Sequence, residues 1–165
     1  VESGSDSLLT LDAANQSEQE RLGSLLAQVT PAAFIVYLQG DLGAGKTTLV
    51  RGFLRGLGYL GAVKSPTYTL LEPYQLERGM VYHLDLYRLA DASELEYLGL
   101  RDLLTSDAVL LFEWPERGAG ELPEADLRIR IHYRGEGRRL DLSAASAKGR
   151  RLIEELAGLL PQRVN

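Results

Sequence analysis

Two kinds of hydrophobic pattern alternate along the chain, and together they predict an α/β fold. Residues 33–38 and 108–112 are continuous apolar runs with β-branched or aromatic members. Such runs are typical of strands that are buried on both faces, as in a parallel sheet. Residues 80–87 instead alternate between two faces, as a strand between two different environments does. Residues 33–38 and 108–112 are therefore expected to be buried strands of a central sheet, and residues 80–87 a further strand with two different faces.

Helical periodicity marks four further segments. Apolar residues recur every three to four positions in a segment that Pro31 ends and in another that Gly58 closes. Ser93, followed three residues later by Glu96, has the spacing of a capping box, which predicts the start of a helix. The predicted helices span residues 17–29, 49–57, 93–104 and 147–160.

The remaining segments predict a hairpin and further extended chain. Apolar and basic residues alternate over 127–134, and a glycine-containing turn joins this segment to 138–142, so the two are expected to form a hairpin. Further expected segments are extended chain at 8–11 and 67–74 and a polar loop at 117–125. The pattern predicts a mostly parallel central sheet with antiparallel edge strands, between helical layers, followed by a C-terminal hairpin and a helix.

Length and composition are those of one compact domain. The chain has 165 residues, 45% of them apolar, and we found neither an internal repeat nor a linker. We therefore expect residues 1–165 to form a single domain, in which residues 1–7 are a loose N-terminus. The absence of cysteine excludes disulfides and thiolate metal sites. No apolar run is long enough to span a membrane and no secretory signal is recognisable, so a cytoplasmic location without a membrane partner is expected.

Charge is distributed unevenly. The net charge of −5 argues against nonspecific binding of nucleic acid by the whole surface. Residues 126–165, however, carry nine Lys or Arg and five Asp or Glu. Arg128, Arg130 and Arg134 are expected on the outer face of one strand, where they could meet a nucleic acid or an acidic partner. The alternative is a simply solvated strand face.

A glycine-rich loop follows the first apolar run and precedes a helix, and it predicts a phosphate site. Glycines let the backbone approach phosphates closely, and the helix N-terminus offers unpaired N–H groups. Lys46 is expected to reach the β- and γ-phosphates of ATP, and the Thr47 hydroxyl to ligate Mg²⁺. The loop reads Gly40, Asp41, Leu42, Gly43, Ala44, Gly45, Lys46, Thr47 and Thr48.

Two acidic residues are candidates to position Mg²⁺ or the attacking water. Glu113 ends a buried apolar strand, where open α/β sheets place their ligands, although an ordinary strand-end carboxylate would look the same. Asp85 lies among apolar neighbours and is expected to face either the site or an arginine such as Arg88. His83 shares its strand face and is as compatible with packing as with catalysis.

A short segment between the loop and these acids has the residues of a switch. Ser65 and Thr67 are placed to contact the γ-phosphate or Mg²⁺, with Pro66 and Tyr68 in the same segment. The alternative is a plain turn that enters a strand.

Four blocks in this order and spacing resemble the bacterial TsaE family, formerly YjeE, over about residues 8–145. They are Gly40 to Thr48, Ser65 to Tyr68, His83 to Arg88, and Glu113-Trp114-Pro115-Glu116. The resemblance implies a P-loop NTPase fold and a slow, Mg²⁺-dependent ATPase of tRNA threonylcarbamoyladenosine biosynthesis. It also implies a switch-like Ser65 to Tyr68, catalytic and metal-binding roles for Asp85 and Glu113, and a functional role for Trp114.

The resemblance further implies two protein partners. TsaD transfers the threonylcarbamoyl group to an adenosine beside the tRNA anticodon, and TsaB is its scaffold. ATP binding and hydrolysis would drive docking on this pair and turnover, with tRNA met only indirectly or weakly. A small-molecule kinase and a nonhydrolytic, ATP-gated interaction module remain alternatives. A GTPase is disfavoured because the three lysines provide no guanine-binding signature.

Overall fold

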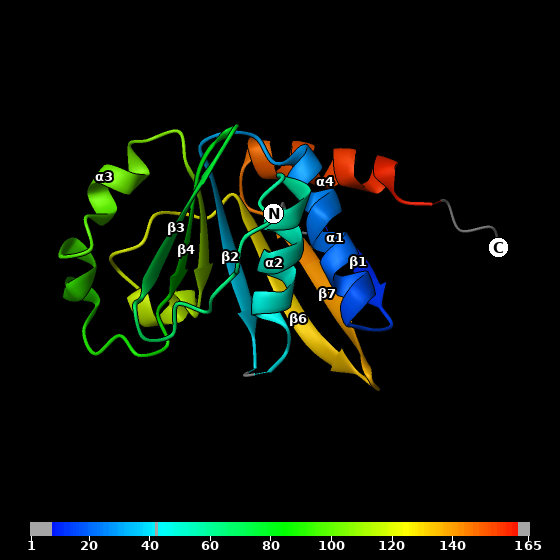
Figure 1. The fold of residues 1–165 in the computed structure, drawn as a ribbon, viewed down its shortest axis with the longest axis horizontal. Helices are drawn as coiled ribbons and strands as arrows, with labels where there is room; N and C mark the ends of the chain where they lie inside the picture. The colour runs from blue at the N-terminus through cyan, green and yellow to red at the C-terminus, as the bar shows by residue number, and fades with distance from the viewer. Residues whose placement is uncertain (1–7, 42, 162–165) are drawn as a thin grey trace, which may run out of the picture.

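The chain was analysed as a computed structural model, which describes residues 8–41 and 43–161. Its centre is a seven-stranded sheet with the order β1-β7-β6-β2-β5-β4-β3 (Figure 1). The strands are β1 (Leu8–Ala13), β2 (Phe34–Gly40), β3 (Leu71–Leu76), β4 (Gly79–Asp85), β5 (Val109–Glu113), β6 (Leu127–Arg134) and β7 (Gly137–Ala144). The loose N-terminus predicted for residues 1–7 and the loop residue Leu42 lie outside the described residues.

The centre of the sheet is parallel and both of its edges are antiparallel. Strand β2 pairs in parallel with β5 and β6, and β4 pairs in parallel with β5. Strands β3, β7 and β1 add antiparallel pairs at the two sides. The predicted α/β fold with a C-terminal hairpin is therefore confirmed. The two continuous apolar runs predicted as buried strands form β2 and β5. Each is flanked by strands on both sides and covered on both faces, which excludes polar side chains and explains the continuous apolar runs.

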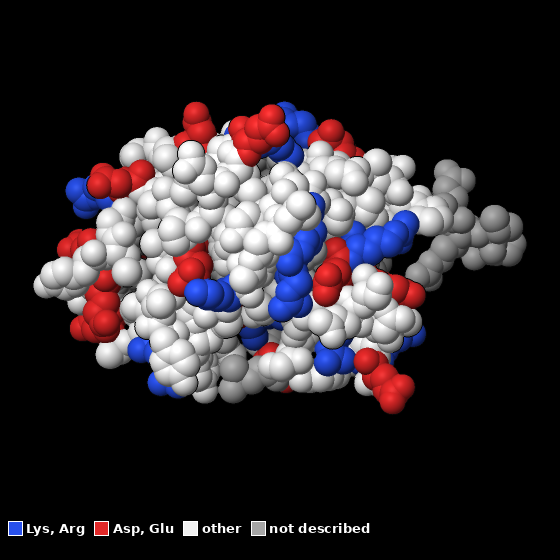
Figure 2. Space-filling view, in the orientation of Figure 1, with Lys and Arg blue, Asp and Glu red and all other residues white. Residues whose placement is uncertain are grey.

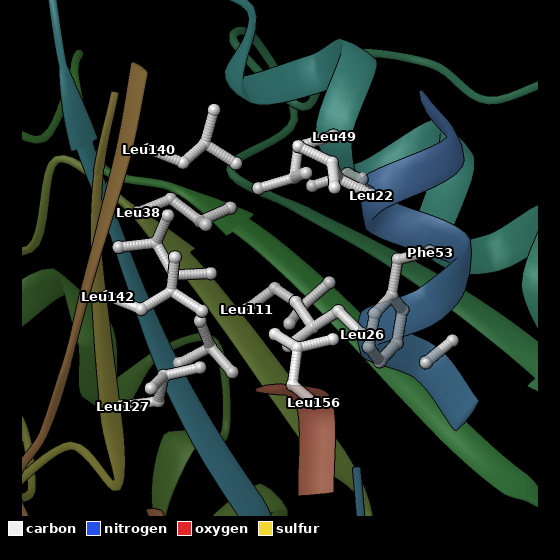
Figure 3. Close-up of a cluster of buried hydrophobic side chains, with 14 of the residues drawn as sticks. Leu22, Leu26, Leu38, Leu49, Phe53, Leu111, Leu127, Leu140, Leu142 and Leu156 are labelled. Carbon is white, nitrogen blue, oxygen red and sulfur yellow. The ribbon is translucent and has the colours of Figure 1, made fainter. Parts of the chain in front are cut away.

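Helices α1 (Gln16–Val29), α2 (Lys46–Gly56) and α4 (Ala147–Leu159) cover one face of the sheet. Figure 3 shows their apolar side chains, among them Leu26, Phe53 and Leu156, meeting leucines of β2, β5, β6 and β7. The opposite face is covered over β4 and β5 by the short helices η2 (Ala92–Glu96), α3 (Leu100–Leu104) and η3 (Pro115–Gly118). None of the described helices is long and apolar enough to cross a membrane.

Helices α1 and α2 pack backbone against backbone. A Cβ atom at Gly52 of α2 would overlap the carbonyl oxygen of Glu20 in α1, and one at Gly23 of α1 would overlap the carbonyl oxygen of Leu49. Side chains at these two positions are therefore excluded by the close approach of the helices. This packing fixes the helix that starts at the glycine-rich loop against its neighbour.

The single helix predicted over residues 93–104 is wrong. The capping residue is Asp91, whose side chain accepts from the Ser93 amide at 3.0 Å, while Glu94 accepts from the Asp91 amide at 2.9 Å. The turn that follows is the short 3-10 helix η2. Gly99 adopts a φ of 76°, which an α-helix cannot accommodate, and α3 starts only after it.

The extended segment predicted over residues 67–74 also begins later than expected. Residues 67–69 form a turn that the Leu70 amide closes by donating to the Pro66 carbonyl at 2.8 Å. Leu70 itself has a φ of 67°, so the chain enters β3 only at Leu71. The polar loop predicted over 117–125 likewise starts within the short helix η3.

Candidate functional site

The glycine-rich loop joins β2 to the N-terminus of α2, as the sequence predicts. Gly45 is the N-cap residue of α2, with a φ of 103°, and Gly43 has a φ of 80°. Both values lie in the left-handed region, which side chains other than glycine rarely adopt. The first turn of α2 starts at Lys46, and its unpaired amides are suited to bind an anion there.

Lys46 is held at the loop by the loop's own carbonyl groups. Its Nζ atom donates to the Gly40 carbonyl at 2.6 Å and to the Asp41 carbonyl at 3.1 Å. Burial lowers the pKa of Lys46, and the nearby carboxylates of Glu113 and Asp85 act in the opposite direction. The ammonium group is thus a desolvated charge, and such a charge gains more from an anionic ligand than an exposed one does.

Three further carbonyl groups of the loop are bound by side chains from outside it. Arg138 of β7 donates through Nε to Ala44 at 3.0 Å and through Nη2 to Gly43 at 3.4 Å. Gln19 of α1, which is buried, donates through Nε2 to the Gly45 carbonyl at 2.8 Å. Two distant elements therefore fix the conformation of the loop.

The two predicted acids lie side by side. Asp85 and Glu113 end the adjacent parallel strands β4 and β5 and are partners in the register. Asp85 accepts from the Tyr87 amide at 3.0 Å and from the Thr67 hydroxyl at 3.3 Å. Burial raises the pKa of Asp85, and the Tyr87 amide opposes that effect. The pair is a partly desolvated acidic centre opposite Lys46.

His83 lies behind Glu113, not at the surface of the pocket. It is fully buried, and its Nε2 atom lies 2.6 Å from Oε2 of Glu113. A carboxylate can only accept, so Nε2 carries the proton and donates it to the hydrogen bond. The Nδ1 atom is buried with no partner among the described residues. His83 therefore orients Glu113 through one carboxylate oxygen.

Trp114 follows Glu113 with a left-handed backbone, at a φ of 56°. The turn places the centroid of its indole ring 4.5 Å from Nζ of Lys46. The same ring lies beside Tyr87, with 5.0 Å between the two ring centroids. Strained conformations of this kind persist where the surroundings enforce them, often at functional sites. The ammonium group of Lys46 therefore makes a cation–π contact with the Trp114 ring, and Tyr87 packs against that ring.

These elements enclose a pocket of about 490 Å³, which is within the usual range for small-molecule sites. Its lining includes most of the predicted site residues. The lining residues are Gly43, Gly45, Lys46, Thr47, Thr48, Ser65, Thr67, Asp85, Tyr87, Arg88, Glu113 and Trp114.

Comparison with known proteins assigns the chain to a family. The family model for threonylcarbamoyl adenosine biosynthesis protein TsaE matches residues 13–140, a range that contains the glycine-rich loop and both acids. The chain belongs to the TsaE family. A TsaE of Haemophilus influenzae, named tRNA threonylcarbamoyladenosine biosynthesis protein, is 50% identical over 138 residues, which cover 81% of this chain and 87% of that protein.

Further relatives agree with this assignment to the TsaE family. The TsaE of Bacillus subtilis, which has the same descriptive name, is 36% identical over 144 residues, covering 87% of this chain and 90% of that protein. Among solved structures, the crystal structure of Bacillus subtilis YdiB superposes with a TM-score of 0.79 and 30% sequence identity. That match covers 92% of this chain and 95% of YdiB.

Other predicted site residues of this TsaE-family chain lie outside the pocket lining. Ala44 is buried behind the loop and Asp41 contributes its carbonyl to Lys46. In the predicted switch segment, the hydroxyl oxygens of Ser65 and Thr67 lie 2.7 Å apart and face the pocket. Pro66 and Tyr68, from the same segment, are not part of the lining, and Leu42 lies outside the described residues.

Four residues with a place at the site were not predicted as site residues. Tyr87 and Arg88 line the pocket, and their position directly after Asp85 at the end of a strand was a usable signal. Gln19 and Arg138 hold the loop from α1 and β7. No local pattern marks these two residues, because they reach the loop only through the fold.

The site of this TsaE-family chain fits a nucleotide with Mg²⁺. A Cβ atom at Gly45 would overlap the Gln19 amide, so the loop admits no side chain there. Gly45 itself lines the pocket at the N-terminus of α2, where a phosphate would bind. No group of three or more His, Cys, Asp or Glu side chains in the described ranges is suited to hold a metal alone. Mg²⁺ commonly binds through one or two carboxylates together with substrate phosphates, and Asp85, Glu113 and the Thr47 hydroxyl match that donor set.

The arginines of β6 form no uniform basic surface. Arg134 contacts Asp12 at 3.3 Å, and the guanidinium of Arg128 lies 5.8 Å from the centroid of the Tyr37 ring. Arg130 is exposed. On the face that carries α2, basic and acidic side chains are interspersed (Figure 2). A solvated strand face and contact with tRNA or an acidic partner both stay predictions for these arginines.

Proposed function

We propose that this chain is a Mg²⁺-dependent ATPase of tRNA threonylcarbamoyladenosine biosynthesis that assists the TsaB–TsaD complex. The pathway is taken from the names of its TsaE relatives. The observation that carries the ATPase assignment is the arrangement of Lys46 and Thr47 at a helix N-terminus opposite Asp85 and Glu113 in one pocket. In this proposal the protein acts in the cytoplasm and meets tRNA only indirectly or weakly.

Each residue has a role that follows from its chemistry. Lys46 and the first amides of α2 bind the β- and γ-phosphates. The Thr47 hydroxyl and Asp85 hold the Mg²⁺ side, where the ion, when bound, neutralises charge on the phosphate oxygens. Glu113 keeps one carboxylate oxygen on His83 and turns the other toward the attacking water. An oxygen of the Glu113 carboxylate can accept a proton from this water.

Hydrolysis serves docking and release in this proposal. ATP would favour the conformation of Ser65 and Thr67 that engages the partner complex, and loss of the γ-phosphate would release it. The hydroxyl contact from Thr67 to Asp85 links this segment to the acidic centre. A low rate for the isolated protein follows if the partner completes the site.

The central test measures phosphate release from labelled ATP and Mg²⁺, with and without TsaB and TsaD. We expect slow release by the protein alone and a clear increase when both partners are present. Complex formation should be stronger with ATP than with ADP in a pull-down. Transfer of the label to a small metabolite instead of water would refute the ATPase proposal and support a kinase.

Two substitutions separate binding from hydrolysis. Lys46→Ala should lower ATP affinity, because it removes the charge that faces the β- and γ-phosphates. Glu113→Gln should keep that affinity and slow hydrolysis by about 100-fold or more, because the amide cannot accept the proton of water. Nucleotide affinity is measured by calorimetry and turnover by phosphate release. Equal loss of affinity in both variants would show that Glu113 is a binding ligand only.

A further inference from the structure

Positive charge in the pocket is distributed unequally. Lys46 is tied to the carbonyl groups of the loop, and the opposite wall carries the acids Asp85 and Glu113. In phosphoryl transfer, negative charge spreads over the oxygens of the γ-phosphoryl group, and an arginine is well suited to stabilise it. Arg88 is the other cationic residue that lines this pocket, and it lies on the side of Asp85.

Arg88 has few contacts that would hold it in a structural role. Within residues 8–41 and 43–161 its guanidinium contacts only Tyr68: Cζ lies 4.3 Å from the centroid of the ring, and Nη2 donates to the phenol oxygen at 3.3 Å. No carboxylate of these residues forms an ion pair with it. Arg138, by contrast, donates to carbonyl groups of the phosphate loop. The Arg88 charge is therefore available to a ligand.

The backbone that carries Arg88 is fixed, although its side chain is exposed. The Tyr87 amide donates to Asp85, and the Leu86 amide donates to the Glu113 carbonyl at 3.0 Å. Because the backbone is fixed and the guanidinium is loosely held, Arg88 can reach a phosphate by side-chain rotation without any movement of a strand. Tyr68, which holds the guanidinium, is 81% exposed and lies in the turn after Thr67.

We infer that Arg88 is a catalytic residue that contacts the γ-phosphate, and that Tyr68 restrains its guanidinium outside that position. This inference rests on the proposed ATPase function. The stacking and the hydrogen bond to Tyr68 compete with the phosphate for the same guanidinium. Each turnover therefore requires Arg88 to leave Tyr68, and part of the slowness of the isolated protein lies in that restraint.

The step itself is ordinary hydrolysis. The oxygen of water bonds to the γ-phosphorus while the bond from that phosphorus to the β–γ bridging oxygen breaks. ADP leaves with the bridging oxygen and its electron pair, and the proton of the water passes through Glu113 to the released phosphate. Arg88 donates hydrogen bonds to the γ-phosphoryl oxygens throughout and exchanges no proton.

The first test compares Arg88→Ala, Arg88→Lys and the control Arg130→Ala, an exposed arginine of β6 outside the pocket. We expect Arg88→Ala to lower kcat by about 100-fold or more while the Kd for ADP stays within about two-fold. Arg88→Lys should restore only part of the rate because it lacks the planar fork. Arg130→Ala should behave as the unsubstituted protein. An unchanged kcat, or an equal loss of ADP and ATP affinity, in Arg88→Ala would overturn the inference.

The second test removes the restraint. Tyr68→Ala should raise kcat by about two- to five-fold, the factor expected for an exposed cation–π contact. In the Arg88→Ala background the same substitution should have no effect on kcat. An equal effect of Tyr68→Ala in both backgrounds, or a loss of rate, would show that Tyr68 does not act through Arg88.

A binding measurement separates this inference from the proposed function. The ratio of the dissociation constants of ADP and of a nonhydrolysable ATP analogue, with Mg²⁺, reports contact with the γ-phosphate without hydrolysis. Arg88→Ala should shift this ratio toward ADP by about ten-fold, whereas Arg130→Ala should leave it unchanged. A shifted ratio in a protein that releases no phosphate would refute the ATPase proposal and keep the contact. An unshifted ratio in an active ATPase would refute the role of Arg88.

Discussion

At the scale of single residues, buried charges are gathered at the pocket. Lys46, Asp85 and Glu113 are each no more than 5% exposed, although a buried charge is costly without a partner. Burial lowers the pKa of Lys46 and raises the pKa of Asp85, so both shifts oppose the charged form. These charged residues therefore contribute less to the stability of the folded protein than apolar residues would. Binding of a Mg²⁺-nucleotide would compensate both charges at once.

The pKa of Asp85 predicts how stability depends on pH. Because its pKa is raised above 3.8 in the folded state, the folded state binds more protons than the unfolded state between 3.8 and the raised value. The contribution of Asp85 to the free energy of unfolding therefore falls as the pH rises through that window. Asp85→Asn should remove this decrease in the free energy of unfolding, because the amide does not titrate.

The measurement is urea denaturation of both proteins, without nucleotide, over a series of pH values. The stability of Asp85→Asn relative to the unsubstituted protein should increase from acid to neutral pH and then level off. A difference that is constant over the whole range would contradict a raised pKa.

Residues of the site differed in how well the sequence predicts them. Lys46 and Thr47 were recognisable because the chemistry of a phosphate loop is contained in a few consecutive residues. Gln19 and Arg138 contact the same loop from 26 and 94 positions away from their partners Gly45 and Ala44. Neither belongs to a local pattern, so their roles depend on a fold that periodicity alone does not specify.

At the scale of elements, the contact between α1 and α2 sets the direction of α2, the helix proposed to bind phosphate. Gly52 allows the backbones to touch, since the carbonyl oxygen of Glu20 occupies the position of a side chain. The close packing continues at Gly56, where a Cβ atom would collide with Ser24. The helix that begins at Lys46 therefore depends on small residues well away from the pocket.

Gly52→Ala should lower the free energy of unfolding by about 2 kcal/mol or more, because the obstructing atoms belong to a backbone that cannot rotate away. The control is Gly158→Ala in α4, where a Cβ atom meets nothing within 4 Å. That substitution should raise stability by about 0.5–1 kcal/mol through the lower entropy of the unfolded chain. Urea denaturation measures both, and equal effects of the two substitutions would refute the packing argument.

The elements also show where hydrophobic patterns mislead. Strands β2 and β5 were predictable because burial on both faces leaves long apolar runs. The prediction of one helix over 93–104 was wrong for two reasons. The capping-box spacing fits both Ser93 with Glu96 and the true pair, Asp91 with Glu94, and Gly99 ends the turn in a left-handed conformation. Hydrophobic periodicity identifies which side chains are buried, but it does not reveal a single left-handed φ such as that of Gly99.

At the scale of the whole molecule, the two halves of the sheet contribute different parts of the site. Strands β4 and β5 provide the acids, and the helical layer with β2 provides the phosphate loop. Hairpin β6–β7 lies on the other side of β2 and supports that loop through Arg138, whose guanidinium also stacks over Tyr133 at 4.3 Å. The C-terminal hairpin thus supports the proposed nucleotide site without lining the pocket.

Arg138→Met should weaken ATP affinity by about ten-fold, because the Gly43 and Ala44 carbonyls lose a charged donor while the apolar stem is retained. Arg130→Met, on the exposed side of β6, is the control and should leave affinity unchanged. Calorimetric titration measures the affinity, and circular dichroism verifies that both variants are folded. Unchanged affinity in Arg138→Met would show that the loop keeps its conformation unaided.

The pairing of β1 with β7 has a consequence for the order in which the protein is made. Leu8 lies opposite Ser143, so β1 leaves the ribosome long before its partner strand β7 has been synthesised. Until then β1 has an open edge, and the phosphate loop lacks the support of Arg138. Long-range pairing of this kind slows folding and leaves strands exposed in the meantime. A nascent chain would therefore complete the proposed nucleotide site only after β7 has been synthesised, when β1 also gains its partner strand.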